Sequence, residues 1–538
     1  MRRARIISQS FFFALFLILL SLTEYKGTDR IDYPVKLFFD FDPLVALSTF
    51  LAAHSVPRIL LWSLLVAGGT LAFGRFFCAW VCPLGTLNHL LSHNRRKPAE
   101  KIRRNRYDSR QSWKYVAVIF ILAASVLGLQ LAGFLDPFSV LIRSFGLAVS
   151  PAINYLLRAA AYPLLALDWP WLTDLVEPSF TFLRKYALSF EQPYFSQGLF
   201  LGCLFLAIAL LNVLRRRFWC RFLCPLGAFL GLLSRFSLLR LEVDPETCTG
   251  CMSCAKNCEG ACEPQKTETW VRGECLPCWN CVESCPNSSI KIRLGLPARA
   301  DRAVDITRRE VLASVGGAVG ALALLRIDPR KIAPSASLSS GNASHRFNPL
   351  LIRPPGAVEE QEFLKRCVKC GECMKVCIKN AIHPTLMEAG LEGIWSPYLK
   401  MQLGYCEFNC TLCGQVCPTG AIEELALERK QKVKIGLAFF DKNRCIPYAL
   451  GRNCIVCQEV CPTPQKAIIF EEVEVLDPQG NKVTVKQPRI DPHLCIGCGM
   501  CEYVCPVVDK PGVYVTSIGE SRSKNNQLLL DVYGGGSA

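Results

Sequence analysis

The chain has 538 residues, a formal net charge of +16, 51% hydrophobic residues and thirty cysteines. It is too long for one domain, and it is not a secreted disulfide scaffold, because such scaffolds are short and space their cysteines irregularly. The basic residues cluster beside apolar segments, which is the positive-inside pattern of a membrane protein and requires no nucleic-acid partner. These clusters are Arg2, Arg3 and Arg5; Arg95, Arg96, Lys97, Lys101, Arg103, Arg104 and Arg106; and Arg215, Arg216, Arg217 and Arg221.

Residues 1–235 are predicted to form an α-helical membrane domain with four spans. Each apolar segment is close to the roughly 20 residues that a helix needs to cross a hydrocarbon core. The segments are Ile6–Leu22, Ile59–Val81, Trp113–Phe134 and Gln197–Leu214. No small-residue cleavage site follows the first segment, which favours an anchor over a signal peptide. The basic clusters place the N-terminus, and the ends of spans two and four, in the cytoplasm.

The membrane domain contains an internal repeat. The string Arg-Phe-aromatic-Cys-x3-Cys-Pro-Leu-Gly occurs at Arg75–Gly85 and again at Arg217–Gly227, and an Asp-Pro pair precedes each, at Asp42-Pro43 and Asp136-Pro137. Because parallel repeats are common in membrane folds, each half is predicted to hold a helix, an outer Asp-Pro segment and a second helix that ends in the cysteine string. The second half has the longer outer loop, Ser139–Tyr194.

The two repeated strings contain four cysteines, Cys78, Cys82, Cys220 and Cys224. Each pair is spaced i, i+4 and is predicted to share one helix face at the inner end of a span. Repetition of the whole string favours a metal site or a redox-thiol site. The alternative is four small buried hydrophobes, with each proline ending its helix. Cys203, in the fourth span, is interpreted as a packing residue, and Cys262 is assigned no role.

Six groups of four cysteines follow in polar sequence, and each closes on a Cys-x3-Cys step. They are Cys248, Cys251, Cys254 and Cys258; Cys275, Cys278, Cys281 and Cys285; Cys367, Cys370, Cys373 and Cys377; Cys406, Cys410, Cys413 and Cys417; Cys445, Cys454, Cys457 and Cys461; and Cys495, Cys498, Cys501 and Cys505. The first two quartets predict a two-cluster domain over residues 240–295, and the other four predict a four-cluster domain over residues 363–520. Both are expected to be α+β, ferredoxin-like domains. A linker at 328–362, rich in Pro, Ser, Gly and Asn, precedes the second domain, and a flexible tail at 521–538 follows it.

The spacing C-x2-C-x2-C-x3-C-P is that of bacterial [4Fe–4S] ferredoxins, in which three thiolates hold one cluster and the fourth reaches a neighbouring cluster. Structural zinc is the alternative for any single Cys-x2-Cys pair, but six quartets with this spacing favour iron–sulfur clusters. We therefore expect six [4Fe–4S] clusters, with the twenty-four quartet cysteines as iron ligands. The exchange of fourth ligands predicts one cluster on Cys248, Cys251, Cys254 and Cys285, and its partner on Cys258, Cys275, Cys278 and Cys281.

Between the two cysteine-rich parts, Arg308 and Arg309 precede a mild, Gly- and Ala-rich apolar stretch that ends at Leu325. Such a pattern is typical of a twin-arginine export signal, so residues 305–327 are predicted to form an internal signal and a fifth anchor helix. The alternative is an amphipathic or buried helix, because about 15 apolar residues are few for a span. The export interpretation predicts a multi-pass protein of the bacterial inner membrane. It places the N-terminus and residues 240–305 in the cytoplasm and residues 328–538 in the periplasm.

Several cofactors have no motif in the sequence. It lacks a Cys-x2-Cys-His haem attachment string and a Gly-rich nucleotide fingerprint between a strand and a helix, so we expect no c-type haem, flavin or nucleotide. Of the six histidines, only His54, His89 and His93 lie near the membrane part. A bis-histidine b haem is therefore not indicated, and His89 and His93 are interpreted as a solvated helix end.

Residues 1–300 resemble the H-type membrane quinol dehydrogenase ferredoxin of the periplasmic nitrate reductase system, through the paired Cys-Pro-Leu-Gly strings and the two quartets after them. Residues 305–520 resemble the G-type periplasmic ferredoxin of that system and the methylamine-utilisation ferredoxin. The matching strings there begin at Cys367, Cys417, Cys445 and Cys495. The chain is thus similar to a fusion of two subunits that are usually separate, with the export signal left internal.

The resemblance implies a membrane-bound quinol dehydrogenase that draws electrons from the quinone pool. It implies delivery through the clusters to a periplasmic reductase, such as a nitrate reductase, or to its cytochrome c, and export of the C-terminal half by the twin-arginine machinery. The last four quartets resemble four-cluster electron-transfer subunits, which implies that the outer two quartets exchange a ligand and that the inner two do likewise. The N-terminal half also resembles membrane ferredoxins that serve copper-enzyme assembly or nitrous oxide reduction. That second resemblance implies instead a maturation or regulatory role for a periplasmic metalloenzyme, in which the Cys-x3-Cys-Pro strings handle metal or disulfides.

Overall fold

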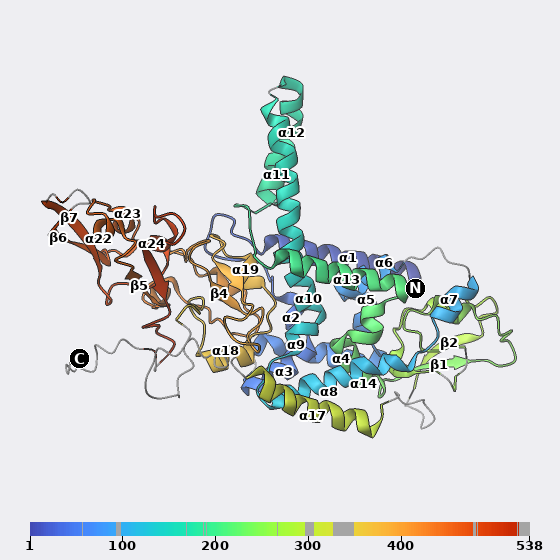
Figure 1. Cartoon of the computed structure of the whole chain (residues 1–538). Helices are drawn as coiled ribbons and strands as arrows, with labels where there is room; N and C mark the ends of the chain where they lie inside the picture. Colours follow the sequence, from blue (N-terminus) through green and yellow to red (C-terminus); the bar gives the residue numbers. More distant parts are fainter. Residues whose placement is uncertain are drawn as a thin grey trace.

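The structure is a computed structural model of the chain (Figure 1). It describes residues 1–526, except for residues 56, 93–97, 168, 187, 190, 266, 269, 296–305, 327–348, 477–479, 481, 524 and 525. Most of the predicted linker 328–362 and tail 521–538 therefore lies outside the described residues, as does His93. A helical bundle (residues 1–235) carries a two-quartet module (residues 236–295) at one end and a four-quartet module (residues 349–523) at the other (Figure 1).

The bundle is built from long helices joined by several short ones. Its elements are α1 (Arg2–Leu22), α2 (Leu37–Asp40), α3 (Pro43–Ala53), η1 (Arg58–Trp62), α4 (Ser63–Phe73), α5 (Phe76–Trp80), α6 (Pro83–Leu91), α7 (Pro98–Arg104), η2 (Ser109–Ser112), α8 (Trp113–Val126), α9 (Ala132–Leu135), α10 (Pro137–Ser144), η3 (Phe145–Val149), α11 (Ser150–Ala166), α12 (Pro170–Tyr186), α13 (Gly198–Leu214), η4 (Trp219–Leu223) and α14 (Pro225–Ser234). Helices α1, α8 and α13 run along the axis that joins the two modules (Figure 1). One apolar core holds them together, and Phe16, Leu44, Tyr115 and Phe138 are among its buried side chains.

Two helices of the described chain are long and apolar enough to cross a membrane, Arg2–Leu22 and the continuous helix Pro137–Ala166. The first contains the predicted span Ile6–Leu22. The second lies where the sequence predicted an outer loop, Ser139–Tyr194, so that prediction was wrong. Helix α12 returns against α11, and the pair forms a hairpin that stands away from the bundle (Figure 1). This segment is helical because Leu and Ala, which are strong helix formers, dominate α11.

Glycines interrupt two of the predicted spans. Gly74, with a φ of +70°, ends α4 inside the predicted span Ile59–Val81. Helix α8 ends at Val126, before Gly128 at a φ of +81°. Glycine adopts this left-handed backbone without steric cost, which is why it ends helices. The predicted count of four spans is therefore not confirmed, although α13 occupies the fourth predicted segment.

Asp42 and Asp136, the Asp-Pro residues of the two repeats, begin equivalent helices and lie together in the core. Asp42 caps α3 by accepting a hydrogen bond from the backbone N–H of Leu44 (2.8 Å). Asp136 caps α10 by accepting one from Ser139 (2.8 Å). Both side chains are fully buried, and their carboxyl groups interact with each other. An aspartate cap followed by proline is a strong helix start, so the two halves of the repeat meet at this pair.

The two-quartet module contains β1 (Leu239–Val243), α15 (Ser253–Asn257), η5 (Arg272–Glu274), α16 (Asn280–Glu283) and β2 (Ile290–Leu294). Strands β1 and β2 are antiparallel. The loop at residues 273–277 sits on the cysteine strings of the bundle. Arg75 Nη1 donates to the carbonyl of Gly273 (3.0 Å), and Trp80 Nε1 donates to that of Pro277 (2.8 Å). The first repeat therefore holds the module in place.

The segment with the twin arginine forms helix α17 (Arg308–Leu325), which packs along α8. Its start is fixed by a capping box, in which Glu310 N–H donates to Thr307 Oγ1 (3.2 Å) and Thr307 N–H donates to Glu310 Oε2 (2.8 Å). Ala318 is fully buried against α8. The helix runs from the side of the two-quartet module towards the four-quartet module (Figure 1).

The four-quartet module combines short helices with two-stranded sheets, as expected for an α+β domain. Its elements are α18 (Glu360–Arg366), α19 (Glu372–Lys375), β3 (Ile382–Pro384), β4 (Pro397–Leu399), α20 (Leu412–Gln415), α21 (Leu427–Lys430), β5 (Leu437–Phe440), α22 (Ile446–Ala449), α23 (Val456–Glu459), β6 (Ile468–Leu476), β7 (Lys482–Ile490), α24 (Met500–Tyr503) and β8 (Val513–Thr516). The antiparallel pairs are β3–β4, β5–β8 and β6–β7.

The loop at residues 367–371 of the four-quartet module is buried in the bundle. Arg143 Nη1 donates to the carbonyl of Lys369 (2.9 Å), and Lys369 Nζ donates to that of Gln130 (2.8 Å). Gly133 of α9 approaches so closely that a Cβ atom there would lie 1.8 Å from the carbonyl oxygen of Val368. The module is therefore seated in the bundle.

His383 of β3 lies at this junction, and its ring packs edge-on against Phe195 of the bundle with centroids 5.7 Å apart. Burial lowers its pKa to about 4. Because a histidine of the unfolded chain titrates near about 6.5, the unfolded state takes up a proton first as the pH falls. The contribution of His383 to the free energy of unfolding is therefore complete above about pH 6.5 and is lost between about pH 6.5 and 4. We expect the free energy of unfolding to fall by about 2 kcal/mol from pH 7.5 to pH 5. His383→Gln should remove this loss in thermal denaturation measured at both pH values.

The matched control is His493→Gln, because His493 is exposed on the same module. This variant should keep the pH dependence of the natural chain. An equal pH dependence in the two variants would show that His383 does not couple protonation to folding.

Candidate functional site

The two-quartet module gathers its eight quartet cysteines into two groups. One cavity is lined by Cys248, Cys251, Cys254 and Cys285. In the other group, Cys281 interacts electrostatically with Cys258, Cys275 and Cys278. Each group thus takes three cysteines from one quartet and the fourth from the other, which is the arrangement that the ferredoxin spacing predicts.

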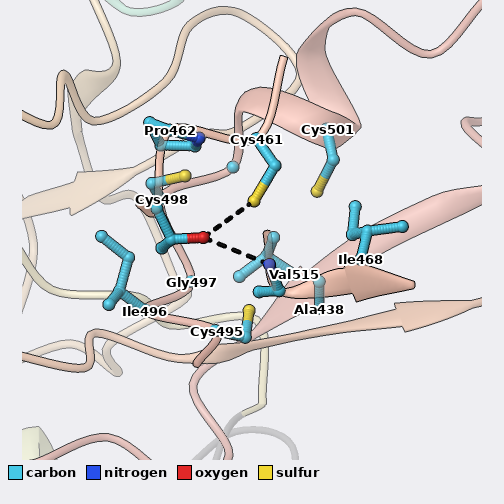
Figure 2. A pocket seen from close by; sticks show the side chains of 13 residues that line it. Ala438, Cys461, Pro462, Ile468, Cys495, Ile496, Gly497, Cys498, Cys501 and Val515 are labelled. Carbon is cyan, nitrogen blue, oxygen red and sulfur yellow. Dashed lines mark hydrogen bonds between the residues drawn. The ribbon is translucent and has the colours of Figure 1, made fainter. Parts of the chain in front are cut away.

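The four-quartet module contains four such groups. Figure 2 shows Cys461 beside Cys495, Cys498 and Cys501. The others are Cys505 with Cys445, Cys454 and Cys457; Cys417 with Cys367, Cys370 and Cys373; and Cys377 with Cys406, Cys410 and Cys413. The first quartet therefore exchanges its fourth cysteine with the second, and the third with the fourth.

The expected exchange between the outer two quartets and between the inner two was wrong. The bridge between Ala357 and Ile422 closes a segment that contains the first two quartets. The β5–β8 pair closes a segment that contains the last two. Each closed segment brings its own two quartets together, so the module consists of two dicluster units in tandem.

These cavities fit an iron–sulfur cluster. The cavity of Cys498 is otherwise lined mainly by apolar groups such as Ala438, Ile468 and Val515. Burial raises the pKa of the Cys498 thiol to about 12, because a thiolate loses its hydration there. Four thiolates in an apolar cavity need compensating positive charge. A bound metal supplies this charge when it displaces the thiol protons.

Backbone N–H groups support the fourth cysteines of these groups. The bonds are Ala381 N–H to Cys377 Sγ (3.3 Å), Ile422 N–H to Cys417 Sγ (3.4 Å) and Gly512 N–H to Cys505 Sγ (3.2 Å). Hydrogen bonds of this kind stabilise thiolate charge and tune the reduction potential of a cluster. Within the described residues, no three Cys, His, Asp or Glu side chains converge as ligands of a single metal ion would. In a cubane, each thiolate binds a different iron atom.

Cys262, which the sequence left without a role, lies in the second group of the two-quartet module. Its Sγ atom is 3.5 Å from that of Cys258. We expect Cys262→Ala to keep the cluster held by Cys258 but to make its reduction potential more negative. The reduced cluster carries one more negative charge, and the variant lacks the Cys262 S–H group that stabilises this charge by hydrogen bonding to Cys258. A potentiometric titration followed by EPR tests this, with Cys203→Ala as the control. An unchanged potential would show that Cys262 serves packing alone.

The bundle brings together Cys78, Cys82, Cys220 and Cys224, called the bundle cysteines below. Cys82 interacts electrostatically with Cys78 and Cys220, and Cys224 interacts with all three others. The prediction that each pair shares a helix face was wrong, since Cys82 (ψ 118°) and Cys224 (ψ 111°) are extended and cap α6 and α14. Proline disfavours the helical backbone in the residue before it. Each proline therefore begins a helix, and does not end one as the alternative supposed.

Two further interpretations need correction. Cys203 is exposed on α13 and is therefore not a packing residue, because no other part of the described chain covers that face of the helix. His89 is not simply a solvated helix end. Its Nδ1 atom lies 3.1 Å from a carboxylate oxygen of the buried Glu259. All thirty cysteines are described, and none of them forms a disulfide.

Two family models match the chain. The 4Fe-4S binding domain matches residues 55–103, 197–243 and 413–436. Its first two segments contain the Cys-x3-Cys-Pro strings. The 4Fe-4S dicluster domain matches residues 366–421 and 451–508, which correspond to the two tandem units of the four-quartet module.

The ferredoxin-type protein NapG of Escherichia coli (strain K12) is 30% identical over 223 residues, which cover 40% of this chain and 88% of NapG. The chain belongs to the ferredoxin-type iron–sulfur proteins. The methylamine utilization ferredoxin-type protein MauM of Methylorubrum extorquens is 32% identical, over 37% of this chain and 84% of MauM. The putative electron transport protein YccM of Escherichia coli (strain K12) is 27% identical, over 47% of this chain and 60% of YccM. No solved structure matches this chain.

This ferredoxin-type electron-transfer protein also has a buried ionic network that the sequence analysis missed. Arg5, Arg217 and Arg221 were counted among the charges at the membrane surface, but all three are buried. Arg5 and Arg217 pair with the buried Glu259. Arg221 donates to Asn105 Oδ1 (3.1 Å) and to Gln111 Oε1 (3.0 Å). The sequence contained one indication that Arg217 has a specific role, because Arg217 and Arg75 occupy the same place in the two repeated strings.

Proposed function

We propose that this protein is a fused, membrane-bound electron conduit. It oxidises quinol and passes the electrons through six [4Fe–4S] clusters, held by the twenty-four quartet cysteines, to a periplasmic reductase of the nitrate reductase type or to its cytochrome c. When bound, such clusters accept and release single electrons. The observation that carries the proposal is that both cluster modules are seated on the same helical bundle, at opposite ends.

Both junctions are made by the loops that carry quartet cysteines. Trp80 donates to the loop before Cys278, and Arg143 donates to the loop before Cys370. Electron tunnelling weakens steeply with distance, so a conduit must hold its end modules firmly and with their clusters turned towards the bundle. These two junctions meet that requirement.

The proposal places the two-quartet module in the cytoplasm and the four-quartet module in the periplasm, across the bacterial inner membrane. Helix α17 would then be the fifth anchor, brought to its place by the twin-arginine machinery. Its packing along α8, with Ala318 fully buried, supports a four-quartet module that stays attached. NapG and MauM match only part of the chain, which supports a fusion of a ferredoxin subunit with a membrane subunit.

The test is anaerobic EPR on the detergent-extracted chain before and after addition of menaquinol. We expect reduced [4Fe–4S] signals to form rapidly and to be suppressed by a quinone-site inhibitor. The variant Cys501→Ser serves as a marker, because Cys501 belongs to the dicluster unit that does not contain the buried loop at residues 367–371. It should lose one signal and keep rapid reduction of the others.

Clusters that dithionite reduces and menaquinol does not would contradict the proposal. That outcome would favour the maturation role, in which the chain supports the assembly of a periplasmic metalloenzyme. Reduction by menaquinol that is insensitive to the inhibitor and equally fast in heat-treated protein would also contradict it, because the reaction would then need no binding site.

A further inference from the structure

The bundle cysteines lie close to one another, and none of them is a ligand of the six expected clusters. Cys78 lies in α5 and Cys220 in η4, while Cys82 and Cys224 cap the helices that follow. The two repeats thus contribute one equivalent pair each to a common site. An iron–sulfur cluster takes four thiolate ligands, and four is the number of cysteines that the two repeats supply.

Two of these sulfurs accept hydrogen bonds from the backbone. Gly85 N–H donates to Cys82 Sγ (3.4 Å) and Gly227 N–H donates to Cys224 Sγ (3.2 Å). The bonds match those at the fourth cysteines of the four-quartet module. Each sulfur also lies at the N-terminus of a helix, α6 or α14, where negative charge is stabilised. Sulfurs that only fill space need neither feature.

Two buried arginines lie beside the four thiols in the same twofold pattern. Arg75 interacts with Cys78 and Cys224, and Arg217 interacts with Cys82 and Cys220. Within the described part of the chain, Nη2 of Arg217 and Nε of Arg75 are buried and have no hydrogen-bond acceptor. Unpaired guanidinium donors in an apolar core are costly. An anion bound among the sulfurs would satisfy them.

Gly227 keeps one of these arginines against its sulfur. A Cβ atom at this position would lie 2.8 Å from Nη2 of Arg75 and 3.5 Å from Sγ of Cys224. A larger residue at this position would push the guanidinium away from its present place. The Cys-Pro-Leu-Gly order therefore sets both the N–H donor and the space for the cation.

The buried carboxylates do not balance the buried cations. Glu259 is shared by the buried Arg5 (3.5 Å) and Arg217 (3.1 Å), and also by the partly exposed Arg216 (2.7 Å). Glu274 is shared by Arg75 (3.6 Å) and Lys114. Uncompensated buried charge is strongly destabilising. A cubane with four thiolates carries a net charge of about −2, which offsets the surplus, whereas four protonated thiols carry none.

The bundle cysteines occupy the space between the two modules. One continuous apolar core contains Cys78, Cys82 and Cys224 together with Leu276 of the two-quartet module and Cys370 of the four-quartet module. The ring of Phe77, next to Cys78, packs against that of Phe138 with centroids 6.0 Å apart. Phe138 belongs to the same core as Cys370, so packed side chains lead from the site to the buried loop of the four-quartet module.

We infer that Cys78, Cys82, Cys220 and Cys224 bind a seventh iron–sulfur cluster, which relays electrons between the two modules. Its reductant and its oxidant are the clusters on either side. One electron enters the iron core and one leaves it, with no bond broken and no proton transferred. The role as a relay rests on the proposed function, but binding of the cluster does not.

The experiment counts iron, acid-labile sulfide, copper and zinc in the full-length chain, purified anaerobically in detergent from cells grown on 57Fe. Seven [4Fe–4S] clusters correspond to about 28 iron atoms per chain, and six to about 24. We expect the higher value for the natural chain and the lower value for the double variant Cys78→Ala/Cys220→Ala. Mössbauer spectra should lose about one seventh of their cluster area in this variant.

The control is Cys203→Ala, because Cys203 lies in the same bundle but is exposed on α13. It should keep the iron content of the natural chain. A natural chain with about 24 iron atoms, or with copper or zinc in place of the missing iron, would overturn the inference even if the double variant fails to fold. Seven clusters that menaquinol does not reduce would leave the seventh site standing and refute the quinol reaction.

Discussion

Replacement of Glu259 by glutamine is expected to destabilise the protein by about 3–5 kcal/mol, the usual effect of removing one partner of a buried ion pair. The carboxylate is fully buried and pairs with Arg5, Arg216 and Arg217. Burial by itself would raise the pKa of Glu259, but Arg216 and Arg217 hold that pKa well below its usual range. A neutral amide would leave the buried guanidiniums without a counter-charge.

The effect can be measured by denaturation of the detergent-extracted chain, followed by tryptophan fluorescence at neutral pH. Glu242→Gln is a matched control, because Glu242 pairs with Arg293 (3.4 Å) at an exposed site of the same module. That change should cost less than about 1 kcal/mol. Equal losses in the two variants would show that the network around Glu259 does not secure the two-quartet module.

Gly133→Ala is expected to unseat the four-quartet module while leaving its clusters in place. The added Cβ atom would lie 1.8 Å from the carbonyl oxygen and 2.5 Å from the carbonyl carbon of Val368. Backbone on both sides prevents the rotamer changes that relieve most overpacking, which itself costs about 1–3 kcal/mol. The loop at residues 367–371 should therefore open more often, and its amide hydrogens should exchange about tenfold faster.

Hydrogen–deuterium exchange read by mass spectrometry measures this, with iron content determined on the same samples. The control is Gly320→Ala on α17, where a Cβ atom would meet no other atom within 4 Å. Unchanged protection of residues 367–371 in Gly133→Ala would mean that the module is not held by this close approach. Loss of iron would instead point to damage within the module.

Features that depend on a few neighbouring residues could be predicted well. The four cysteines of a quartet are separated by two or three residues in most cases, so a short loop places them and the spacing alone indicates the cluster type. The Asp-Pro and Cys-Pro strings also mark helix starts, because proline fixes its own backbone and restricts the residue before it. The sequence still assigned the Cys-Pro prolines to helix ends, since it treated each string as the end of a span.

Features that depend on distant contacts could not be predicted. The order of the quartets does not reveal that the β5–β8 pair encloses the third and fourth of them. The composition of residues 139–194 does not reveal that they fold back as a helical hairpin. Arg217 has the signature of a charge at the membrane surface, yet its burial follows from Glu259, which lies in another module.

Cysteine spacing and helix caps are local properties, so the order of the amino acids alone identifies a ferredoxin-type protein with repeated cysteine quartets and an internally repeated bundle. Three features emerge only once the chain is folded. They are the pairs of quartets that exchange ligands, the seating of both modules on the bundle, and the meeting of the bundle cysteines among buried arginines. Those outcomes depend on charge compensation and close packing between segments that are far apart in the chain.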